Sequence, residues 1–244
     1  MTAPGNTSAA VRQQRHEAHD SLDDFPTPPW ATRALCETIR NKGLLPPLAS
    51  AEDPAANRGH MHKVLAEYFA DARGADVFDY GAGFPVRDYL LGPPPLDVTW
   101  MITNPPFKLG EAFIHRGLSH ARHVAVFVRS AFCEGEGRHA RLFADNPPSL
   151  ELQFCERVVL WKGLCLDPDV PVTRWNDKKQ AFVTEKPTSA TAYSWLIWGA
   201  GKPGRTLKEW IAPGTRARLT RPGDYPPLPP ELLPRPIEQE GALL

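Results

Sequence analysis

Four consecutive residues, Asn104-Pro105-Pro106-Phe107, bring together a side-chain amide, two rigid backbone units and an aromatic ring. They follow an apolar run that reads as a strand. The prolines cannot continue a central strand, because neither can donate a backbone hydrogen bond, so they fix a stiff loop at the strand's carboxyl end. Open α/β sheets bind their ligands at that end. The amide oxygen of Asn104 and the carbonyl oxygen of Pro105 can therefore both face one bound amine.

The chemistry that such a pair of acceptors serves is group transfer to an exocyclic amine. An amine whose lone pair is delocalised into a ring is a poor nucleophile. Acceptors on its N–H bonds favour a nitrogen closer to tetrahedral, with its lone pair aimed at an electrophile. Phe107 offers a flat face for a base taken out of its stack. The alternative is a plain structural turn, which Asn-Pro-Pro also forms.

The sequence NPPF after a strand resembles the catalytic motif of S-adenosylmethionine-dependent amino-methyltransferases, above all the phage and bacterial DNA adenine-N6 type. The resemblance implies S-adenosylmethionine as cofactor and adenine-containing DNA as substrate. It implies direct in-line transfer of a methyl group to N6 of a flipped adenine. The implied catalytic residues are Asn104, Pro105, Pro106 and Phe107.

The stretch EDPAANRGHM resembles the E-P-A-x-G-x-G-H-M form of the cofactor loop in the same family. The resemblance assigns cofactor contacts to Asp53, Pro54, Ala55, Asn57 and Gly59. Asn57 stands where the family has glycine, and asparagine tolerates a left-handed backbone better than most residues. The later DYGAGF cannot be this loop. Its Gly83 lies about twenty residues before Asn104, and a βαβ unit takes roughly thirty.

Three further cofactor residues follow from the resemblance. Asp76, after the second strand, would bind the ribose hydroxyls, and Asp88 would contact the adenine amino group. Thr27, in DDFPTPPW, would help to hold the methionine carboxylate. The alternatives are a helix cap or a solvated loop acid for the aspartates and an N-cap for Thr27. The motif order is the gamma arrangement, and the resemblance covers about residues 23–199.

The elements that must position these residues alternate between strand and helix. Strands are expected over 97–103, 123–129, 150–161 and 191–199, and helices over 28–43, 60–72, 110–121 and 137–146. We expect an α/β class I, Rossmann-like methyltransferase fold: a mostly parallel seven-stranded sheet with an antiparallel final hairpin and helices on both faces. The strands expected before Asp53 and Asp76 are weakly apolar for a buried sheet.

Composition adds boundaries to this interpretation. The 244 residues carry 28 Lys+Arg against 28 Asp+Glu, so any nucleic-acid surface must be local. Four cysteines without C-x-x-C spacing, and histidines 115, 120 and 123 without a shared face, argue against a metal site. We expect no membrane span, a cytoplasmic protein, a disordered tail over 1–20, a methyltransferase domain over 21–200 and a basic, then proline-rich extension over 201–244. The oligomeric state is left open.

A DNA surface is expected on the loop before the last strand, which interleaves cations with an aromatic residue. The residues concerned are Lys108 beside the catalytic motif and Arg174, Trp175, Lys178 and Lys179 on the loop. The alternative is a solvated charged surface. Two other functions stay open. One is methyl transfer to RNA guanine-N2 or protein glutamine. The other is a degenerate, non-catalytic methyltransferase fold that acts as a DNA-binding module.

Overall fold

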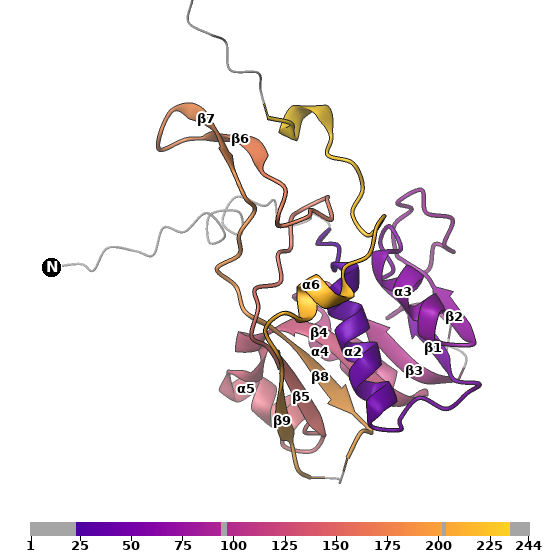
Figure 1. Cartoon of the computed structure of the whole chain (residues 1–244). Coiled ribbons are helices and arrows are strands. Elements are labelled where there is room, and N and C mark those ends of the chain that lie inside the picture. The colour runs from indigo at the N-terminus through magenta and orange to yellow at the C-terminus, as the bar shows by residue number, and fades with distance from the viewer. Residues whose placement is uncertain (1–22, 94–96, 202–203, 235–244) are drawn as a thin grey trace, which may run out of the picture.

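A seven-stranded sheet with the order β2-β1-β3-β4-β8-β5-β9 forms the centre of the molecule (Figure 1). The computed structural model describes residues 23–93, 97–201 and 204–234, so the tail expected over 1–20 lies outside the described residues. The strands are β1 Ser50–Asp53, β2 Asp71–Gly74, β3 Val98–Thr103, β4 Ala121–Arg129, β5 Leu150–Phe154, β8 Tyr193–Trp198 and β9 Leu207–Ile211. All pairings are parallel except those of β8, which runs antiparallel to both β4 and β5.

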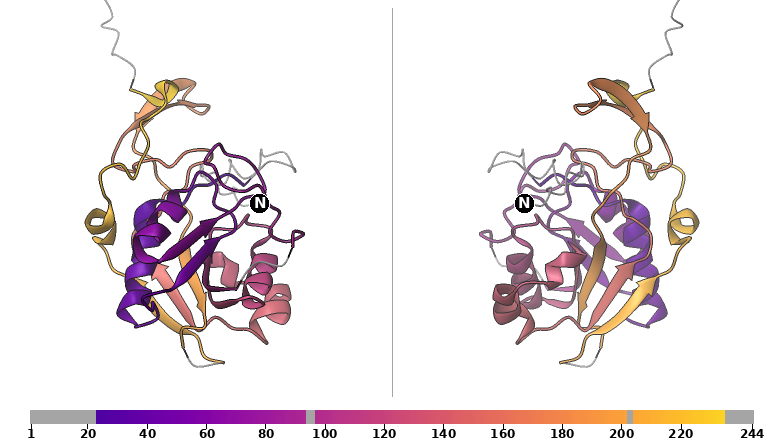
Figure 2. Two further views of the ribbon diagram at one scale, coloured as in Figure 1. Left: turned by 90° about the vertical axis from the view of Figure 1, so that its right-hand side faces the viewer. Right: turned by 90° about the vertical axis from the view of Figure 1, so that its left-hand side faces the viewer.

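Helices cover both faces of this sheet (Figure 2). The helices are α2 Pro29–Asn41, α3 His60–Tyr68, α4 Gly110–Leu118, α5 Glu136–Arg138 with the following π-helical turn His139–Phe143, and α6 Thr215–Leu219; short 3-10 turns lie at Ser130–Cys133 and Pro230–Leu232. The residues of α2 and α3 pack on one face of the sheet, and those of α4 and the π-helical turn pack on the other. The predicted architecture is confirmed.

The core on the α2 face is built from large aromatic residues. Trp30, Trp100 and Trp195 are almost fully buried there. The indole nitrogen of Trp195 donates to the carbonyl oxygen of Ala31 across 3.0 Å. This buried nitrogen therefore has a hydrogen-bond partner. This packing ties the antiparallel strand β8 to the first helix of the fold.

The two weakly apolar strands exist for identifiable reasons. β1 lies between β2 and β3, and its polar residues have partners: Ser50 and Thr99 exchange hydrogen bonds between the side chain of one and the backbone of the other, and buried Glu52 pairs with Arg87. β2 is an edge strand, so its polar side chains reach water. Its Gly74 is required, because an added Cβ would lie 2.7 Å from the Phe84 ring.

Three expected elements differ most from the structure in their bounds. The helix expected over 60–72 ends at Tyr68, and its last residues form β2 instead. The strand expected over 150–161 ends at Phe154, where the chain leaves the sheet; Glu156 accepts a hydrogen bond from the backbone of Arg216. The helix expected over 137–146 is a short α-turn followed by a π-helical turn.

The segment after residue 200 supplies the last strand of the sheet. β9 pairs with β5 in parallel, within the range expected as a basic extension. The chain then crosses α2, where Arg33, 1% exposed, forms ion pairs with Asp224 at 2.6 Å and Glu67 at 2.7 Å. Several cations of this segment are likewise paired with carboxylates. These are Lys208 with Glu151, Arg216 with Asp169, Arg218 with Glu37 and Arg221 with Glu67.

A two-stranded hairpin stands away from the sheet (Figures 1 and 2). Its strands, β6 Val172–Asn176 and β7 Ala181–Glu185, lie in the connection from β5 to β8. Because β5 runs parallel to β3 and β4 within the sheet, this connection leaves from the edge at which β3 ends in Asn104. Within the described ranges, every helix is too short or too polar to cross a bilayer.

Candidate active site

The motif Asn104–Phe107 follows β3 directly at the carboxyl edge of the sheet, as the sequence predicted. Pro105 is buried, and the carbonyl oxygen of Pro106 accepts a hydrogen bond from Leu109 in the turn that leads into α4. Gly110, the first residue of α4, lies so close to Phe132 that an added Cβ would come within 3.1 Å of the ring. The motif is thus a stiff connection between a buried strand and a closely packed helix.

Asn104 presents its two amide atoms in different ways. Its Nδ2 donates to the carbonyl oxygen of Phe25 across 2.9 Å. Its Oδ1 is buried and accepts no hydrogen bond from the residues that the structure describes. A buried acceptor without a partner costs on the order of 1–3 kcal/mol, so such atoms in folded proteins mark places where a ligand or water binds. The oxygen is available for the N–H of a bound amine.

Two side chains contact the ring of Phe107. Its ring centroid lies 5.4 Å from that of Phe25, and the guanidinium carbon of Arg129 lies 3.9 Å from the Phe107 centroid. The cation therefore occupies a face that we expected to be open to a flipped base. Arg129 would have to move before a base could stack on that face of the ring. No pattern in the sequence signals this contact, because Arg129 ends a different strand.

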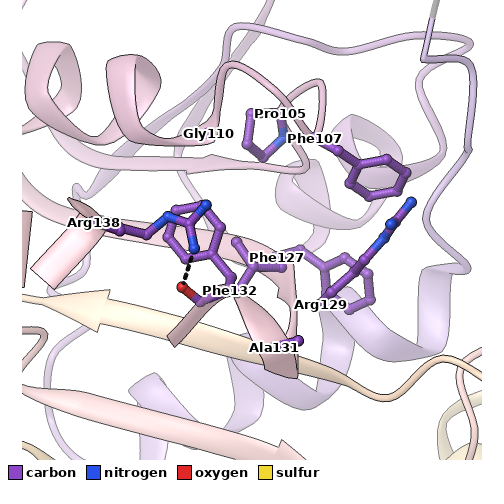
Figure 3. Close-up of a pocket in the computed structure, with 9 residues that line it drawn as sticks. Pro105, Phe107, Gly110, Phe127, Arg129, Ala131, Phe132 and Arg138 are labelled. Carbon is purple, nitrogen blue, oxygen red and sulfur yellow. Dashed lines mark hydrogen bonds between the residues drawn. The ribbon is translucent and has the colours of Figure 1, made fainter. Parts of the chain in front are cut away.

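A cavity of about 250 Å³ opens beside the motif (Figure 3). Pro105, Phe107 and Gly110 form one wall, and Phe127, Arg129 and Phe132 form another. Arg138 also lines it; its guanidinium carbon lies 4.0 Å from the Phe132 ring centroid, and it donates to the Phe132 carbonyl oxygen across 2.7 Å. The aromatic walls suit a planar apolar ligand, and the guanidinium groups add donors for its acceptor atoms or for a phosphate.

A second, smaller cavity lies on the other side of Asn104. It gathers residues from the N-terminal segment, the loop after β1, the start of α3 and the Asn104–Phe107 motif. Its lining consists of Phe25, Pro26, Thr27, Asp53, Ala55, Ala56, Asn57, His60, Met61 and Asn104. The structure thus brings together Thr27, Asp53, Ala55 and Asn57, which the sequence had assigned to one cofactor site. Its volume is about 20 Å³, enough for about one water molecule.

Asp53 ends β1 and faces this small cavity with 1% of its surface exposed. Burial raises the pKa of its carboxyl group to about 7, although hydrogen bonds from Thr103 Oγ1 at 2.8 Å and the amide of Ala55 oppose the shift. The hydroxyl oxygen of Thr27 is buried nearby and has no hydrogen-bond partner among the described residues. These two groups give the cavity polar atoms that a ligand could satisfy.

The loop after β1 has the backbone that the sequence predicted. Asn57 is left-handed, with φ at 51°, and its backbone amide donates to Asp76 Oδ2 across 2.8 Å. Gly59 is also left-handed and precedes α3; an added Cβ there would press on the Phe84 ring at 3.1 Å. Pro54 is buried in the same loop. The departure from glycine at position 57 is therefore compatible with the loop's shape.

The two acids expected at the cofactor's outer end differ in their surroundings. Asp76 is buried, and burial raises its pKa, while the backbone amides of Asn57 and Phe78 donate to it. Asp88 is exposed, and its carboxylate accepts hydrogen bonds from the amides of Leu90 and Leu91. The structure joins Asp76 to the loop and places Asp88 in a turn outside the small cavity's lining.

The expected DNA-contacting residues lie in two separate segments, one directly after the motif and the other on the β6–β7 hairpin. Lys108 is exposed directly after the motif. The others lie on the β6–β7 hairpin: Arg174 pairs with Glu185, Trp175 is 47% exposed against Phe182, and exposed Lys178 and Lys179 form the tip. In the part of the chain that the structure describes, no three His, Cys, Asp or Glu side chains are placed to hold a metal ion.

Two acids that the sequence patterns did not single out also belong to the site. Asp23 accepts a hydrogen bond from the amide of Phe107, and Asp24 accepts from the side chains of Asn57 and Arg58. Both stand directly before the Pro-Thr-Pro segment that carries Thr27. The adjacent acids in DDFPTPPW were a usable signal, because charged residues beside a ligand-binding segment often hold neighbouring loops.

No protein-family model and no curated protein matches the sequence. Solved structures do match the fold. A Listeria monocytogenes protein assigned as a class I S-adenosylmethionine-dependent methyltransferase superposes with a TM-score of 0.54 at 13% identity, over 86% of this chain and 73% of its own. A Vibrio vulnificus protein assigned as the modification subunit of a type I restriction enzyme gives 0.50 at 16% identity, over 84% of this chain and 50% of its own. The chain therefore has the fold of the class I S-adenosylmethionine-dependent methyltransferases.

Proposed function

We propose that this chain is an S-adenosylmethionine-dependent methyltransferase that modifies the exocyclic N6 of adenine in DNA. The observation that carries the proposal is the position of the catalytic motif between two cavities. Asn104 lines the small cavity, and the next residue, Pro105, lines the large one. A methyl donor in one and an acceptor in the other would meet at the motif, which is the arrangement that direct transfer requires.

The residues of the small cavity fit the polar end of S-adenosylmethionine. The orphaned hydroxyl of Thr27 and the buried carboxyl of Asp53 supply hydrogen-bonding atoms, and the left-handed turn at Asn57 and Gly59 brings backbone close to them. Asp76 would reach the ribose and Asp88 the adenine ring. The cavity is small enough that the ligand would bind only if the N-terminal segment or this loop moves outward.

The chain's own residues prepare the amine. Asn104 Oδ1 accepts one N6 hydrogen, since its Nδ2 is already committed to Phe25, and the carbonyl oxygen of Pro105 accepts the other. Phe107 stacks the flipped base once Arg129 leaves its ring, and Pro106 keeps the loop stiff. Bound S-adenosylmethionine supplies the electrophilic methyl group. The dry walls of Phe127 and Phe132 exclude water from the reacting amine.

The β6–β7 hairpin is proposed as the DNA contact. It leaves the sheet at the same edge as the motif, and a two-stranded ribbon fits the major groove. Lys178 and Lys179 at its tip would neutralise phosphates, as Lys108 would beside the motif, while Arg174 and exposed Trp175 would contact the backbone or a base. The fold neighbour assigned as a restriction-enzyme modification subunit is consistent with a DNA substrate.

The test is to supply purified protein with methyl-labelled S-adenosylmethionine and four separate acceptors: duplex DNA, single-stranded DNA, structured RNA and a glutamine-containing peptide. The products are digested and identified by mass spectrometry. The proposal predicts N6-methyladenine from DNA. N2-methylguanine from RNA or methylglutamine would move the function to the other acceptors. A folded protein that neither binds S-adenosylmethionine nor methylates any of the four acceptors would support a non-catalytic module.

A further inference from the structure

The five residues Asp23–Thr27 lie across both loops of the candidate site. The carbonyl oxygen of Phe25 accepts the Asn104 side-chain bond at 2.9 Å, and the carbonyl oxygen of Asp24 accepts one from the amide of Gly163 at 2.8 Å. Thr27 lines the small cavity. One short segment thus contacts the catalytic motif, the cofactor loop and the connection that leads to the β6–β7 hairpin.

Asp23 serves the catalytic motif. Its Oδ2 accepts a hydrogen bond from the backbone amide of Phe107 across 2.6 Å. Pro105 and Pro106 have no N–H, so Phe107 provides the first backbone donor after Asn104. A carboxylate bonded to that amide forms a charge-assisted bond, which is shorter and stronger than a neutral one. Asp23 therefore fixes the main chain from which the Phe107 ring projects.

Asp24 serves the cofactor loop. Its Oδ1 accepts hydrogen bonds from Asn57 Nδ2 at 2.7 Å and from Arg58 Nη1 at 2.6 Å. Arg58 in turn lies over the Tyr80 ring, with its guanidinium carbon 4.9 Å from the centroid. The two donors lie within the turn, whose left-handed residues are Asn57 and Gly59. A glycine at position 57 would adopt the left-handed backbone without strain. With asparagine there, the hydrogen bond to Asp24 helps to stabilise that backbone conformation.

We propose that Asp23 and Asp24 are positioning residues with separate tasks: Asp23 holds the catalytic motif for methyl transfer, and Asp24 holds the cofactor loop for S-adenosylmethionine binding. The inference rests on the proposed function. Neither carboxylate lines either cavity, so both act through the residues that they hold. Adjacent positions in the chain thereby control two different constants, kcat and the dissociation constant of the cofactor.

The test compares Asp23→Ala, Asp23→Asn, Asp24→Ala and Asp24→Asn with the unaltered protein. S-adenosylmethionine affinity is measured by titration calorimetry, and kcat by methyl transfer to adenine-containing DNA at saturating cofactor. Asp24→Ala should weaken cofactor binding about ten- to a hundredfold and leave kcat within about twofold; Asp23→Ala should do the reverse. The asparagine variants keep an acceptor oxygen, so each should recover part of its own loss.

Glu37→Ala provides the matched control, because Glu37 lies on α2 and pairs with Arg218 of α6 rather than with either loop. It should change neither constant. Equal losses of affinity and kcat in both alanine variants, or wild-type affinity in Asp24→Ala, would overturn the inference while leaving the proposed function in place. Should an alanine variant not fold, the asparagine variants carry the same comparison. Failure of the unaltered protein to bind the cofactor would refute the proposed function, and the inference with it.

Discussion

The side-chain nitrogen of Asn104 lies 2.9 Å from the carbonyl oxygen of Phe25, and this bond determines which way the amide faces. With Nδ2 committed, Oδ1 points the other way and stays buried without a hydrogen bond from any described residue. A backbone carbonyl from the N-terminal segment thus leaves the amide oxygen of Asn104 available as an acceptor. The first prediction follows from that orientation.

Replacing Asn104 with alanine should abolish most methyl transfer while the protein still folds. Loss of one hydrogen-bond acceptor aimed at the reacting group should lower kcat about 10²- to 10³-fold. Affinity for S-adenosylmethionine should change much less, since Thr27 and Asp53 remain in the small cavity. Single-turnover rates and calorimetric affinities on the same preparation measure the two effects. A kcat close to that of the unaltered protein would remove Asn104 from the mechanism.

Replacing Asn57 separates backbone conformation from side-chain bonding. Asn57→Ala loses the side-chain bonds and keeps a β-carbon at φ 51°, so it should be less stable than Asn57→Gly by about 1–2 kcal/mol. Asn57→Gly fits that backbone and loses only the bonds to Asp24 and Arg58, at a cost of about 1 kcal/mol. Urea unfolding measures both. An alanine variant as stable as the glycine variant would show that the left-handed turn carries no strain.

Asp53 predicts a pH dependence of stability. Its folded pKa of about 7 lies above the usual value of 3.8, so the folded state favours the protonated carboxyl group. The protonated carboxyl group of Asp53 contributes its full stabilisation of the folded state below the unfolded pKa, and this contribution is lost as pH rises towards 7. Its upper bound is about 4 kcal/mol of unfolding free energy. An asparagine side chain at this position cannot ionise. Asp53→Asn should therefore gain stability over the unaltered protein from pH 5 to pH 8, measured by urea unfolding. A difference in unfolding free energy between the two proteins that stays constant from pH 5 to pH 8 would contradict the raised pKa of Asp53.

The lysines at the hairpin tip should contribute to the salt dependence of DNA binding. Replacing Lys178 and Lys179 with alanine should weaken DNA binding and reduce the slope of log K against log salt concentration by about 2, the value for two lost phosphate contacts. Fluorescence anisotropy with a labelled duplex across a salt series measures the slope. As control, Lys42 and Lys208 are replaced together, because each already pairs with a glutamate on the body. Equal slopes in the two double variants would exclude the hairpin as the DNA contact.

The sequence predicted the fold, and the place of the Asn104–Phe107 motif at the end of a strand, because both rest on local patterns. The apolar run before Asn104 becomes β3, the almost continuous apolar run before Arg129 becomes β4, and the prolines stop the chain at the sheet edge. The left-handed Asn57 was also predictable, since few residues other than glycine and asparagine adopt that conformation readily.

The remaining features depend on contacts between residues that are distant in the sequence. Arg129 on the Phe107 ring and Asp23 on its amide join segments that no local pattern connects. Strand β9 is polar and partly exposed at the sheet edge, so it lacks the apolar run of a buried strand. In the sequence, Arg33 and Asp224 look like two ordinary surface charges. Only the folded chain, in which the C-terminal segment crosses α2, shows that they form a buried pair.

Titration calorimetry of the purified protein with S-adenosylmethionine tests the central claim most directly, because every catalytic step proposed here requires that the loop from Asp53 to Gly59 bind this cofactor. We expect one site per chain with a dissociation constant in the micromolar range, about −8 kcal/mol, and loss of that binding when Thr27 and Asp53 are both replaced by alanine. No heat of binding at millimolar cofactor, from a protein whose folding is verified by circular dichroism, would contradict it.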